Sequence, residues 1–128
     1  MSLWSLLASP LIYSGDMSKL DAFTINVLCN PEVIEVNQDI LGECGMIIRK
    51  SDTCFLMVKN LADGSKAVGL FNRGKVATQV EMDWNELKVK GKYTVRDLWH
   101  QKNIGEKKKK FSAFVPAQGV VMVKISKK

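Results

Sequence analysis

The fold is decided by residues 60–73, whose sequence is NLADGSKAVGLFNR. The dipeptide Asp63-Gly64 lies between two apolar runs, and it is among the strongest short signals for a β-hairpin. A type I′ turn needs positive φ at both of its central residues, which Asp and Gly tolerate. With these two as the loop residues, Val58 pairs with Gly69 across the hairpin.

This register makes both faces of the predicted hairpin apolar. One face carries Phe55, Met57 and Leu70, and the other carries Leu56, Val58 and Phe71. Successive side chains of a strand point to opposite faces, so a ribbon that is apolar on both needs a covering layer on each side. The hairpin is therefore expected inside a β-sandwich, between other elements.

The chain after Gly45 continues this β pattern. Further runs of alternating or apolar residues predict strands at 46–49, 55–59, 76–83, 93–99, 111–115 and 120–125. Residues 101–110 contain few apolar side chains and are expected to form a connecting loop. The predicted fold class is mainly β, an antiparallel Greek-key sandwich of seven or eight strands.

The first part of the chain has a different pattern. Residues 4–9 predict the end of an apolar helix before Pro10, and Leu11–Tyr13 predict a short strand covered on both faces, as in a parallel sheet. A helix over 19–29 follows, with Ser18 and Asp21 as its capping box, and then a short helix over 32–37 after Asn30-Pro31. A short α/β segment therefore precedes the sandwich.

Composition limits the classes of function. The chain has 46% hydrophobic and 25% charged residues, which is typical of a globular domain. The formal net charge is +6, but much of it lies in Lys107–Lys110 and at the C-terminus. We expect these lysines to be solvated and predict no nucleic-acid partner, with binding of an anionic polymer as a weaker alternative.

The cysteines and the N-terminus carry little information. Cys29, Cys44 and Cys54 have no metal-ligand spacing, and we expect all three to be buried or half-buried thiols. The apolar run Leu3–Tyr13 is too short to span a bilayer, so no membrane association is predicted. A leader peptide would lie upstream of this chain, and its cellular location is unknown.

The residues that could carry chemistry form no recognisable motif. His100 is the only histidine, and the possible nucleophiles Ser5, Ser9 and Cys29 have no base in a familiar arrangement. Asp16 follows the predicted strand 11–13, where a turn residue is the simpler expectation. Asp39 and Glu43 lie near the start of the sandwich, and no spacing makes them a glycosidase pair. We assign no catalytic, cofactor-binding or metal-binding residue.

Several stretches nevertheless resemble a known family. The segments WSLLASPL (4–11), NPEVIEVNQD (30–39), LADGSKAVGLFNR (61–73), VRDLW (95–99) and VPAQGVV (115–121) are similar, in this order, to the C-terminal portion of family 27 glycoside hydrolases. These enzymes include α-galactosidases (melibiases) and α-N-acetylgalactosaminidases. Ile40 departs from the family pattern, which usually has proline at that position.

The resemblance implies two parts. Residues 1–43 correspond to the end of a catalytic (β/α)8 barrel, and residues 44–128 correspond to an accessory C-terminal β-sandwich. The family's catalytic aspartates belong to earlier barrel strands, so no position here inherits a catalytic role. The expected function is structural support of the barrel of the parent enzyme, a retaining glycosidase of terminal α-galactosides, and this chain alone is expected to be inactive.

Two alternatives follow from particular residues. Trp84, Tyr93 and Trp99 could form a platform on which a sugar stacks, which would make the chain a free-standing carbohydrate-binding module, although a core role is the simpler expectation. The apolar segment Trp4–Tyr13 would lose its barrel partners. We expect it either to dock on the sandwich or to mediate a homo-oligomer.

Overall fold

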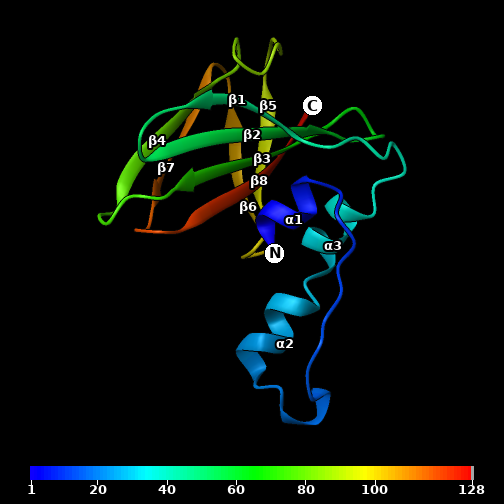
Figure 1. Ribbon diagram of the computed structural model, residues 1–128. Coiled ribbons are helices and arrows are strands. Elements are labelled where there is room, and N and C mark those ends of the chain that lie inside the picture. The colour runs from blue at the N-terminus through cyan, green and yellow to red at the C-terminus, as the bar shows by residue number, and fades with distance from the viewer. Residues whose placement is uncertain (128) are drawn as a thin grey trace.

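The computed structural model describes residues 1–127, which form a sandwich with a helical extension (Figure 1). The strands are β1 (Met46–Lys50), β2 (Cys54–Asn60), β3 (Lys66–Asn72), β4 (Thr78–Asp83), β5 (Tyr93–Asp97), β6 (Lys102–Lys107), β7 (Lys110–Val115) and β8 (Val120–Lys127). One antiparallel sheet has the order β1-β2-β3-β8-β5-β6, and the other contains β4 and β7. The predicted mainly-β antiparallel sandwich is confirmed.

The register of the β2–β3 hairpin differs from the prediction by one residue. Val58 pairs with Val68, and Met57 pairs with Gly69. Gly64 has a φ angle of +79°, but Asp63 does not adopt a positive φ, so the turn is not type I′. The loop instead contains three residues, closed by the hydrogen bond from Leu61 N to Ser65 O at 3.0 Å. Loops of this length use a left-handed residue at the third position, and here Gly64 supplies it.

The shift changes which side chains share a face, because side chains alternate along a strand. Leu70 lies with Leu56 in the core between the two sheets. Phe71 lies on the opposite face, where its ring stacks on that of Phe55 with centroids 4.4 Å apart. Both faces of the hairpin are apolar as predicted, but the assignment of Leu70 and Phe71 was wrong.

Two apolar clusters lie on the two faces of the six-stranded sheet. The cluster between the sheets contains Leu56, Val68, Leu70, Val80, Met82, Trp84, Leu87, Tyr93, Val95, Phe111, Val115, Val123 and Ile125. The cluster under the helices contains Leu6, Val33, Val36, Met57, Leu61, Ala67, Leu98 and Met122. The central strands are therefore covered on both sides, by β4 and β7 on one side and by helices on the other.

The helices that cover this outer face are α1 (Ser2–Leu6) and α3 (Pro31–Asn37). A Cβ atom on Gly69 would lie 2.7 Å from Leu6 Cδ1, so the bare glycine on β3 leaves the space that Leu6 occupies. The prediction for α3 is confirmed, with Asn30 as its N-cap and Pro31 at its first turn. The Asn30 side chain accepts hydrogen bonds from the backbone N–H groups of Glu32 and Val33.

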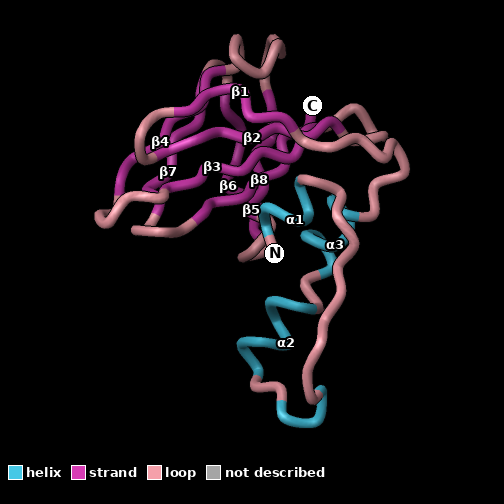
Figure 2. Tube along the Cα trace, viewed as in Figure 1, coloured by secondary structure: helices cyan, strands magenta, loops and turns pink. Residues whose placement is uncertain are grey.

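Residues 10–29, which we call the arm, extend away from the sandwich (Figures 1 and 2). The arm contains a short 3₁₀ helix, η1 (Met17–Lys19), and α2 (Ala22–Leu28). The predicted helix over 19–29 was too long. Its N-cap is Asp21, which accepts a hydrogen bond from Thr24 N, and the capping box assigned to Ser18 was wrong.

The predicted strand Leu11–Tyr13 is not formed. A strand is stabilised by hydrogen bonds to a neighbouring strand. Among residues 1–127, this segment has no such neighbour: it runs beside α2 as a loop (Figure 2). The segment therefore has the apolar pattern of a strand inside a parallel sheet, but residues 1–127 provide no neighbouring strand for it.

The segment Gln101–Lys110 is not a loop but contains β6, which pairs with β5 and forms the edge of the sheet. Edge strands are often polar, because one side faces solvent and charge prevents further pairing. The strand was missed because the prediction required apolar alternation. At its far end the lysine run forms the tight turn to β7.

The cysteine prediction was partly wrong. Cys54 is half-buried, but Cys29 and Cys44 are exposed, and all three are free thiols. No helix among residues 1–127 is both long enough and apolar enough to cross a membrane.

Candidate functional site

The carboxylates considered from the sequence have local structural roles. Asp16 is exposed and caps η1, where its Oδ1 accepts hydrogen bonds from Ser18 N at 3.0 Å and Ser18 Oγ at 2.6 Å. These hydrogen bonds from Ser18 lower the pKa of Asp16, because they stabilise its charged form. Asp16 is therefore the turn residue that we expected.

Asp39 and Glu43 tie the segment after α3 to the β2–β3 hairpin. The backbone N–H of Ala62 donates to Asp39 Oδ1 at 3.0 Å and Oδ2 at 3.1 Å. Asn60 Nδ2 donates to Glu43 Oε2 at 2.9 Å. Each carboxylate is thus used by a different group of the hairpin, and neither arrangement is that of a paired acid and base.

The possible nucleophiles are also separated from a base. Ser5 is fully buried in α1, and its Oγ has no hydrogen-bond partner among residues 1–127. Cys29 is exposed at the end of α2. In the described part of the chain, no hydrogen bond links Ser5, Ser9 or Cys29 to a histidine or carboxylate. Across these residues no three His, Cys, Asp or Glu side chains gather where a metal ion could bind.

Polar contacts fasten α3 to the large sheet. Arg96 on β5 donates to the Glu32 carboxylate from Nε at 2.8 Å and from Nη2 at 2.5 Å. The hydrogen bond to Glu32 raises the pKa of Arg96 further above its ordinary value. The Asn30 side chain donates to Leu98 O at 3.0 Å. These contacts attach the base of the arm to the sandwich.

Lys59 lies under the same helix with its side chain fully buried. Its Nζ donates to Val36 O at 2.5 Å. Burial lowers the pKa of Lys59, because the ammonium is removed from water. One end of the α3 backbone is therefore capped by a lysine from β2.

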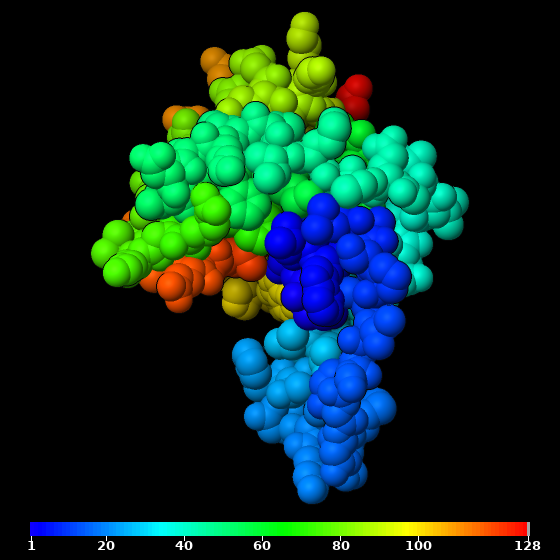
Figure 3. Space-filling model, in the orientation of Figure 1, coloured from blue at the N-terminus to red at the C-terminus, as the bar shows by residue number. Residues whose placement is uncertain are grey.

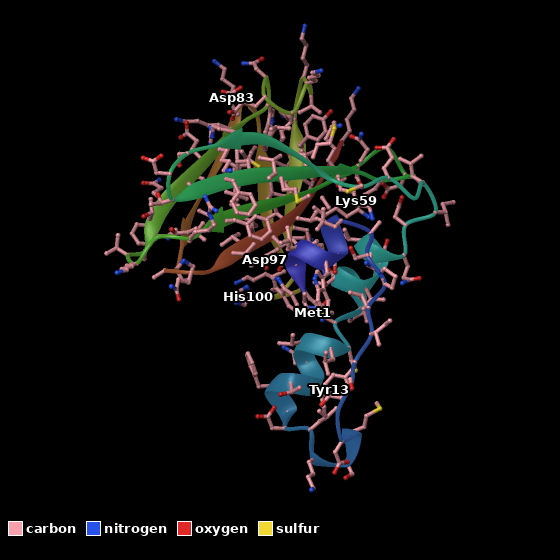
Figure 4. The ribbon with its side chains drawn as sticks, in the orientation of Figure 1. Met1, Tyr13, Lys59, Asp83, Asp97 and His100 are labelled. Carbon is pink, nitrogen blue, oxygen red and sulfur yellow. The ribbon has the colours of Figure 1, made fainter. Side chains whose placement is uncertain are left out.

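A groove opens where α1 and α2 meet the end of the sandwich. Its volume is about 590 Å³, and its lining comes from the first three residues, α2, Phe71, the β5–β6 turn and the start of β8. The side chains that line it include Ser2, Phe23, Asn26, Phe71, Trp99, His100 and Gln118. Figure 4 shows Met1, Asp97 and His100 close together at this edge of the sandwich.

Two hydrogen bonds orient the rings beside the groove. The indole Nε1 of Trp99 donates to Ser2 Oγ at 2.8 Å. His100 Nδ1 lies 2.9 Å from Asp97 Oδ2, and Asp97 Oδ1 accepts from the backbone N–H of both Trp99 and His100 at 3.0 Å. A tight turn after β5 therefore presents Trp99 and His100 together. Their adjacency in the sequence was a signal, but the residues that complete the groove are distant in the chain.

The three aromatic residues proposed as a sugar platform do not share a surface. Trp84 and Tyr93 are buried in the core between the sheets, where their rings pack edge to face at 5.9 Å. Trp99 is half-buried and lines the groove. The core role is confirmed for Trp84 and Tyr93, whereas Trp99 packs at the edge of the cluster under the helices and also lines the groove.

The arm exposes several large apolar side chains. Ile12, Met17 and Phe23 are 78%, 73% and 75% exposed. A second cavity of about 480 Å³ lies between α2 and the segment before it, lined by Met1, Trp4, Leu11, Ile12, Tyr13, Met17, Leu20, Leu28 and Cys29. In the space-filling view the arm stands out from the rest of the molecule (Figure 3).

The segment Trp4–Tyr13 divides between the two regions. Leu6 is fully buried against the sandwich, whereas Trp4 is 51% exposed and Ile12 lies on the arm surface. Its expected docking therefore occurs only at α1, and its expected role in a homo-oligomer stays a prediction. Lys108 and Lys109 are exposed in the β6–β7 turn, as expected for a solvated run, and binding of an anionic polymer is likewise a prediction.

Comparison with known proteins identifies close relatives. Residues 51–125 match the family model of the α-galactosidase C-terminal β-sandwich domain. A probable α-galactosidase of Dictyostelium discoideum is 31% identical over 98% of this chain, and α-galactosidase 2 of Arabidopsis thaliana is 32% identical over 99% of it. The crystal structure of α-galactosidase I from Mortierella vinacea superimposes with a TM-score of 0.95 at 31% identity, over 99% of this chain.

The match covers only part of each relative. The chain spans 34% of the Dictyostelium protein, 33% of the Arabidopsis protein and 34% of the Mortierella structure. About two thirds of each of these proteins has no counterpart in residues 1–128.

Proposed function

Because the chain belongs to the family of α-galactosidase C-terminal β-sandwich domains, we propose that it supports the catalytic barrel of a family 27 glycoside hydrolase. In this proposal residues 1–43 complete the barrel, and residues 44–128 form the accessory sandwich. The whole enzyme is a retaining glycosidase of terminal α-galactosides, whose two catalytic carboxylates lie outside this chain. The partner of the chain is therefore the barrel itself.

The observation that carries the proposal is the exposed apolar side of the arm. Monomeric proteins rarely expose large contiguous apolar patches, and such patches mark contact surfaces. Ile12 and Phe23 are more than 70% exposed, although they lie on a segment whose base is held by several hydrogen bonds. An apolar segment attached in this way is suited to fill a place in a larger core.

The segment Leu11–Tyr13 supports the same arrangement. Its three residues have the pattern of a strand in a parallel sheet, and such strands are covered on both faces. A barrel would supply the neighbouring strands on either side and the helices outside them. We therefore propose that this segment is a barrel strand, with α2 and α3 packed behind it.

The first test is enzymatic. We expect the purified chain to show no hydrolysis of an aryl α-galactoside, because in this proposal both catalytic carboxylates belong to the part of the enzyme outside this chain. Turnover at the rate of an ordinary α-galactosidase would contradict the proposal, provided that the activity stays with the protein through purification.

The second test asks whether the chain can replace a relative's C-terminal third. A chimera would join the first two thirds of Mortierella vinacea α-galactosidase I to this chain, and we expect it to hydrolyse the aryl galactoside. In the chimera, Phe23→Asp should abolish activity and soluble folding, since it places a charge at a buried contact. Phe114→Asp is the matched control, because Phe114 is 70% exposed on the sandwich and should stay exposed.

The comparison of these two variants tests the proposal. If Phe23→Asp and Phe114→Asp leave the chimera equally active and equally stable, the arm does not contact a barrel. If the unmodified chimera folds but the arm remains accessible to protease, the proposal also fails.

A further inference from the structure

The end of the sandwich opposite to the arm carries lysines that the supporting role does not use (Figure 1). Two segments meet there, the connection between β4 and β5 (residues 84–92) and the turn from β6 to β7 (residues 107–110). We call their exposed lysines the lysine surface, which consists of Lys88, Lys90, Lys92, Lys108 and Lys109. In the space-filling view the connection, in yellow-green, forms the top of the molecule (Figure 3).

The tertiary structure brings the two lysine-bearing segments together. The backbone N–H of Trp84 donates to Lys109 O at 2.9 Å, and the indole Nε1 of Trp84 donates to Lys107 O at 3.3 Å. The run Lys107–Lys110 is continuous in the sequence and would by itself be an ordinary solvated turn. The fold adds a second source of positive charge beside it.

A cavity of about 330 Å³ lies between the two segments, and Lys90, Lys108 and Lys109 are part of its lining. Its volume falls within the range of about 300–1,000 Å³ that is typical of small-molecule sites. Asp83 also lines the cavity, where its Oδ1 accepts a hydrogen bond from the backbone N–H of Asn85 at 2.7 Å. Residues 1–43 contribute nothing to the lining, so the sandwich alone forms this cavity.

The positive charge of the lysine surface is not neutralised by the neighbouring carboxylates. Glu81 Oε2 lies 2.9 Å from Lys110 Nζ, and Lys110 is not part of the surface. Glu86 Oε1 lies 2.9 Å from Arg49 Nη1. Glu106 has an interaction of its own. Among residues 1–127, none of the lysines of the surface forms an ion pair, so their ammonium groups remain available to a ligand.

The other side chains at this end favour a charged polymer without bases. Lysine-rich runs bind nucleic acids or acidic polysaccharides such as heparin. Single-stranded nucleic acids gain much of their affinity from bases that stack on aromatic rings. Trp84 and Tyr93, the aromatic residues of this end, are only 3% and 8% exposed and offer no ring for stacking. Residues 84–92 and 107–110 also contain no arginine, whose planar fork matches phosphate.

We propose that the lysine surface binds a linear acidic polysaccharide through its carboxylate or sulfate groups. The exposed ammonium groups pair with successive anionic groups of the polymer, and the cavity between the two segments receives one of its sugar units. Release of counterions from the polymer drives this binding, so its affinity depends strongly on salt. The surface binds and does not hydrolyse. It uses no residue of the part assigned to the barrel, so the proposal is independent of the supporting role.

The experiment measures the affinity of the purified chain for heparin by isothermal titration calorimetry. We expect binding at about 50 mM salt and at least about tenfold weaker binding at about 200 mM salt. Dextran is the control polymer, because it is a neutral polysaccharide, and it should not bind. Single-stranded and duplex DNA at the same concentration of charge should bind at least about fivefold more weakly than heparin.

Two double variants test whether both segments contribute. Lys90→Gln with Lys92→Gln removes two charges from the β4–β5 connection, and Lys108→Gln with Lys109→Gln removes two from the β6–β7 turn. Each pair should weaken heparin binding roughly 5- to 30-fold at about 50 mM salt. Each should also reduce the slope of the logarithm of affinity against the logarithm of salt concentration by about 1 to 2.

A third double variant is the matched control. Lys75→Gln with Lys102→Gln removes the same charge from exposed positions outside the lysine surface. Lys75 precedes β4, whose far end leads into the connection, and Lys102 begins β6, whose far end reaches the turn. This pair should change the affinity less than about twofold. Circular dichroism checks that all three variants are folded.

Four results would overturn the proposal. The first is no binding of heparin at about 50 mM salt, where such binding is strong. The second is equal weakening by all three double variants, which would indicate a response to net charge alone. The third is a loss confined to the variant of the β6–β7 turn, which would indicate that the lysine run acts without the connection. The fourth is DNA binding as tight as heparin binding, which would indicate a nucleic-acid partner.

Discussion

The centre of the sandwich and the arm contain similar apolar side chains, but these are buried in the sandwich and exposed on the arm. Leu56 and Leu70 are fully buried, whereas Ile12 and Phe23 are 78% and 75% exposed. β3 has a hydrogen-bonded strand on each edge and a layer on each face. The arm has neither, although its base is well fixed.

The difference in burial means that apolar residues have different effects on stability in the two regions. In the sandwich such residues stabilise the chain itself, with about 25 cal/mol for each Å² of apolar surface removed from water. In the arm the same residues contribute little until another surface covers them. Substitutions in the two regions should therefore have very different effects on the isolated chain.

The largest effect is expected in the sandwich core. Leu70→Ala should lower the free energy of unfolding by about 2–5 kcal/mol, because it removes buried methyl groups and leaves a cavity. Urea denaturation followed by far-ultraviolet circular dichroism measures this change. A loss below about 1 kcal/mol would indicate that the space around Leu70 collapses easily, which would contradict the contrast between the sandwich core and the arm.

A smaller effect is expected where the helical part meets the sandwich. Gly69→Ala places a methyl group 2.7 Å from Leu6 Cδ1 and against the ring of Phe71. Relief of this overlap should displace α1 and cost about 1–3 kcal/mol. Gly64→Ala is not a suitable control, because Gly64 has a positive φ angle.

Hydrogen exchange gives the matched readout for Gly69→Ala. Faster exchange should be confined to α1 and α3, with β4 and β7 unchanged. Uniformly faster exchange over the whole chain would show that α1 and the sandwich unfold together, against the separation of the two regions.

A still smaller, pH-dependent effect is expected at the hairpin turn. Asp63 accepts hydrogen bonds from Ser65 N at 2.9 Å and Ser65 Oγ, and its Oδ2 lies 2.9 Å from Lys124 Nζ. Mainly the hydrogen bond from the Ser65 hydroxyl, and then Lys124, lower the pKa of Asp63 from 3.8 to about 2. Its ionised form therefore stabilises the fold above pH 4, and this contribution is lost as the pH falls toward 2.

The test compares Asp63→Asn with the parent chain by thermal unfolding between pH 2 and 7. The parent should be more stable at pH 7, and the difference should shrink through the window from pH 4 to 2. Asp52→Asn is the control at an exposed loop position. A difference that stays constant down to pH 2 would contradict the assigned cause.

The smallest effect is expected in the arm. Phe23→Ala should change the free energy of unfolding by no more than about 0.5 kcal/mol, because a side chain that is 75% exposed loses little on truncation. Phe111→Ala provides the comparison, since Phe111 is only 5% exposed and its truncation should cost about 3–5 kcal/mol. If both variants lose equally, the arm is covered in solution, for example by a second copy of the chain.

Most of the fold could be predicted from local sequence patterns. The errors occurred where a strand forms or fails to form because of its neighbouring strands. The helix α3 was predicted correctly because Asn30 and Pro31 are local signals with a direct physical effect. The strand at Leu11–Tyr13 was predicted from its apolar pattern, but a strand needs a partner for its hydrogen bonds. β6 was missed for the opposite reason: its polar sequence does not suggest a strand, but hydrogen bonds to its partner β5 form one.

The candidate site was less accessible than the fold. Nothing in the sequence distinguishes Trp84, Tyr93 and Trp99, yet two are buried between the sheets and Trp99 lies at the edge of the other cluster, where it lines a groove. The other polar groups of that groove, Asn26 and Gln118, carry no motif. A groove that is assembled from distant elements has no local sequence pattern.

The sequence by itself determined the sandwich, the α3 cap and the family resemblance, because turn chemistry, capping and side-chain alternation act over a few residues. Only the tertiary structure showed the hairpin register and which apolar residues are buried. The register followed from a three-residue loop around Gly64, which moved Leu70 and Phe71 to opposite faces. Whether an apolar side chain is buried depends on what packs against it, and no residue carries that information alone.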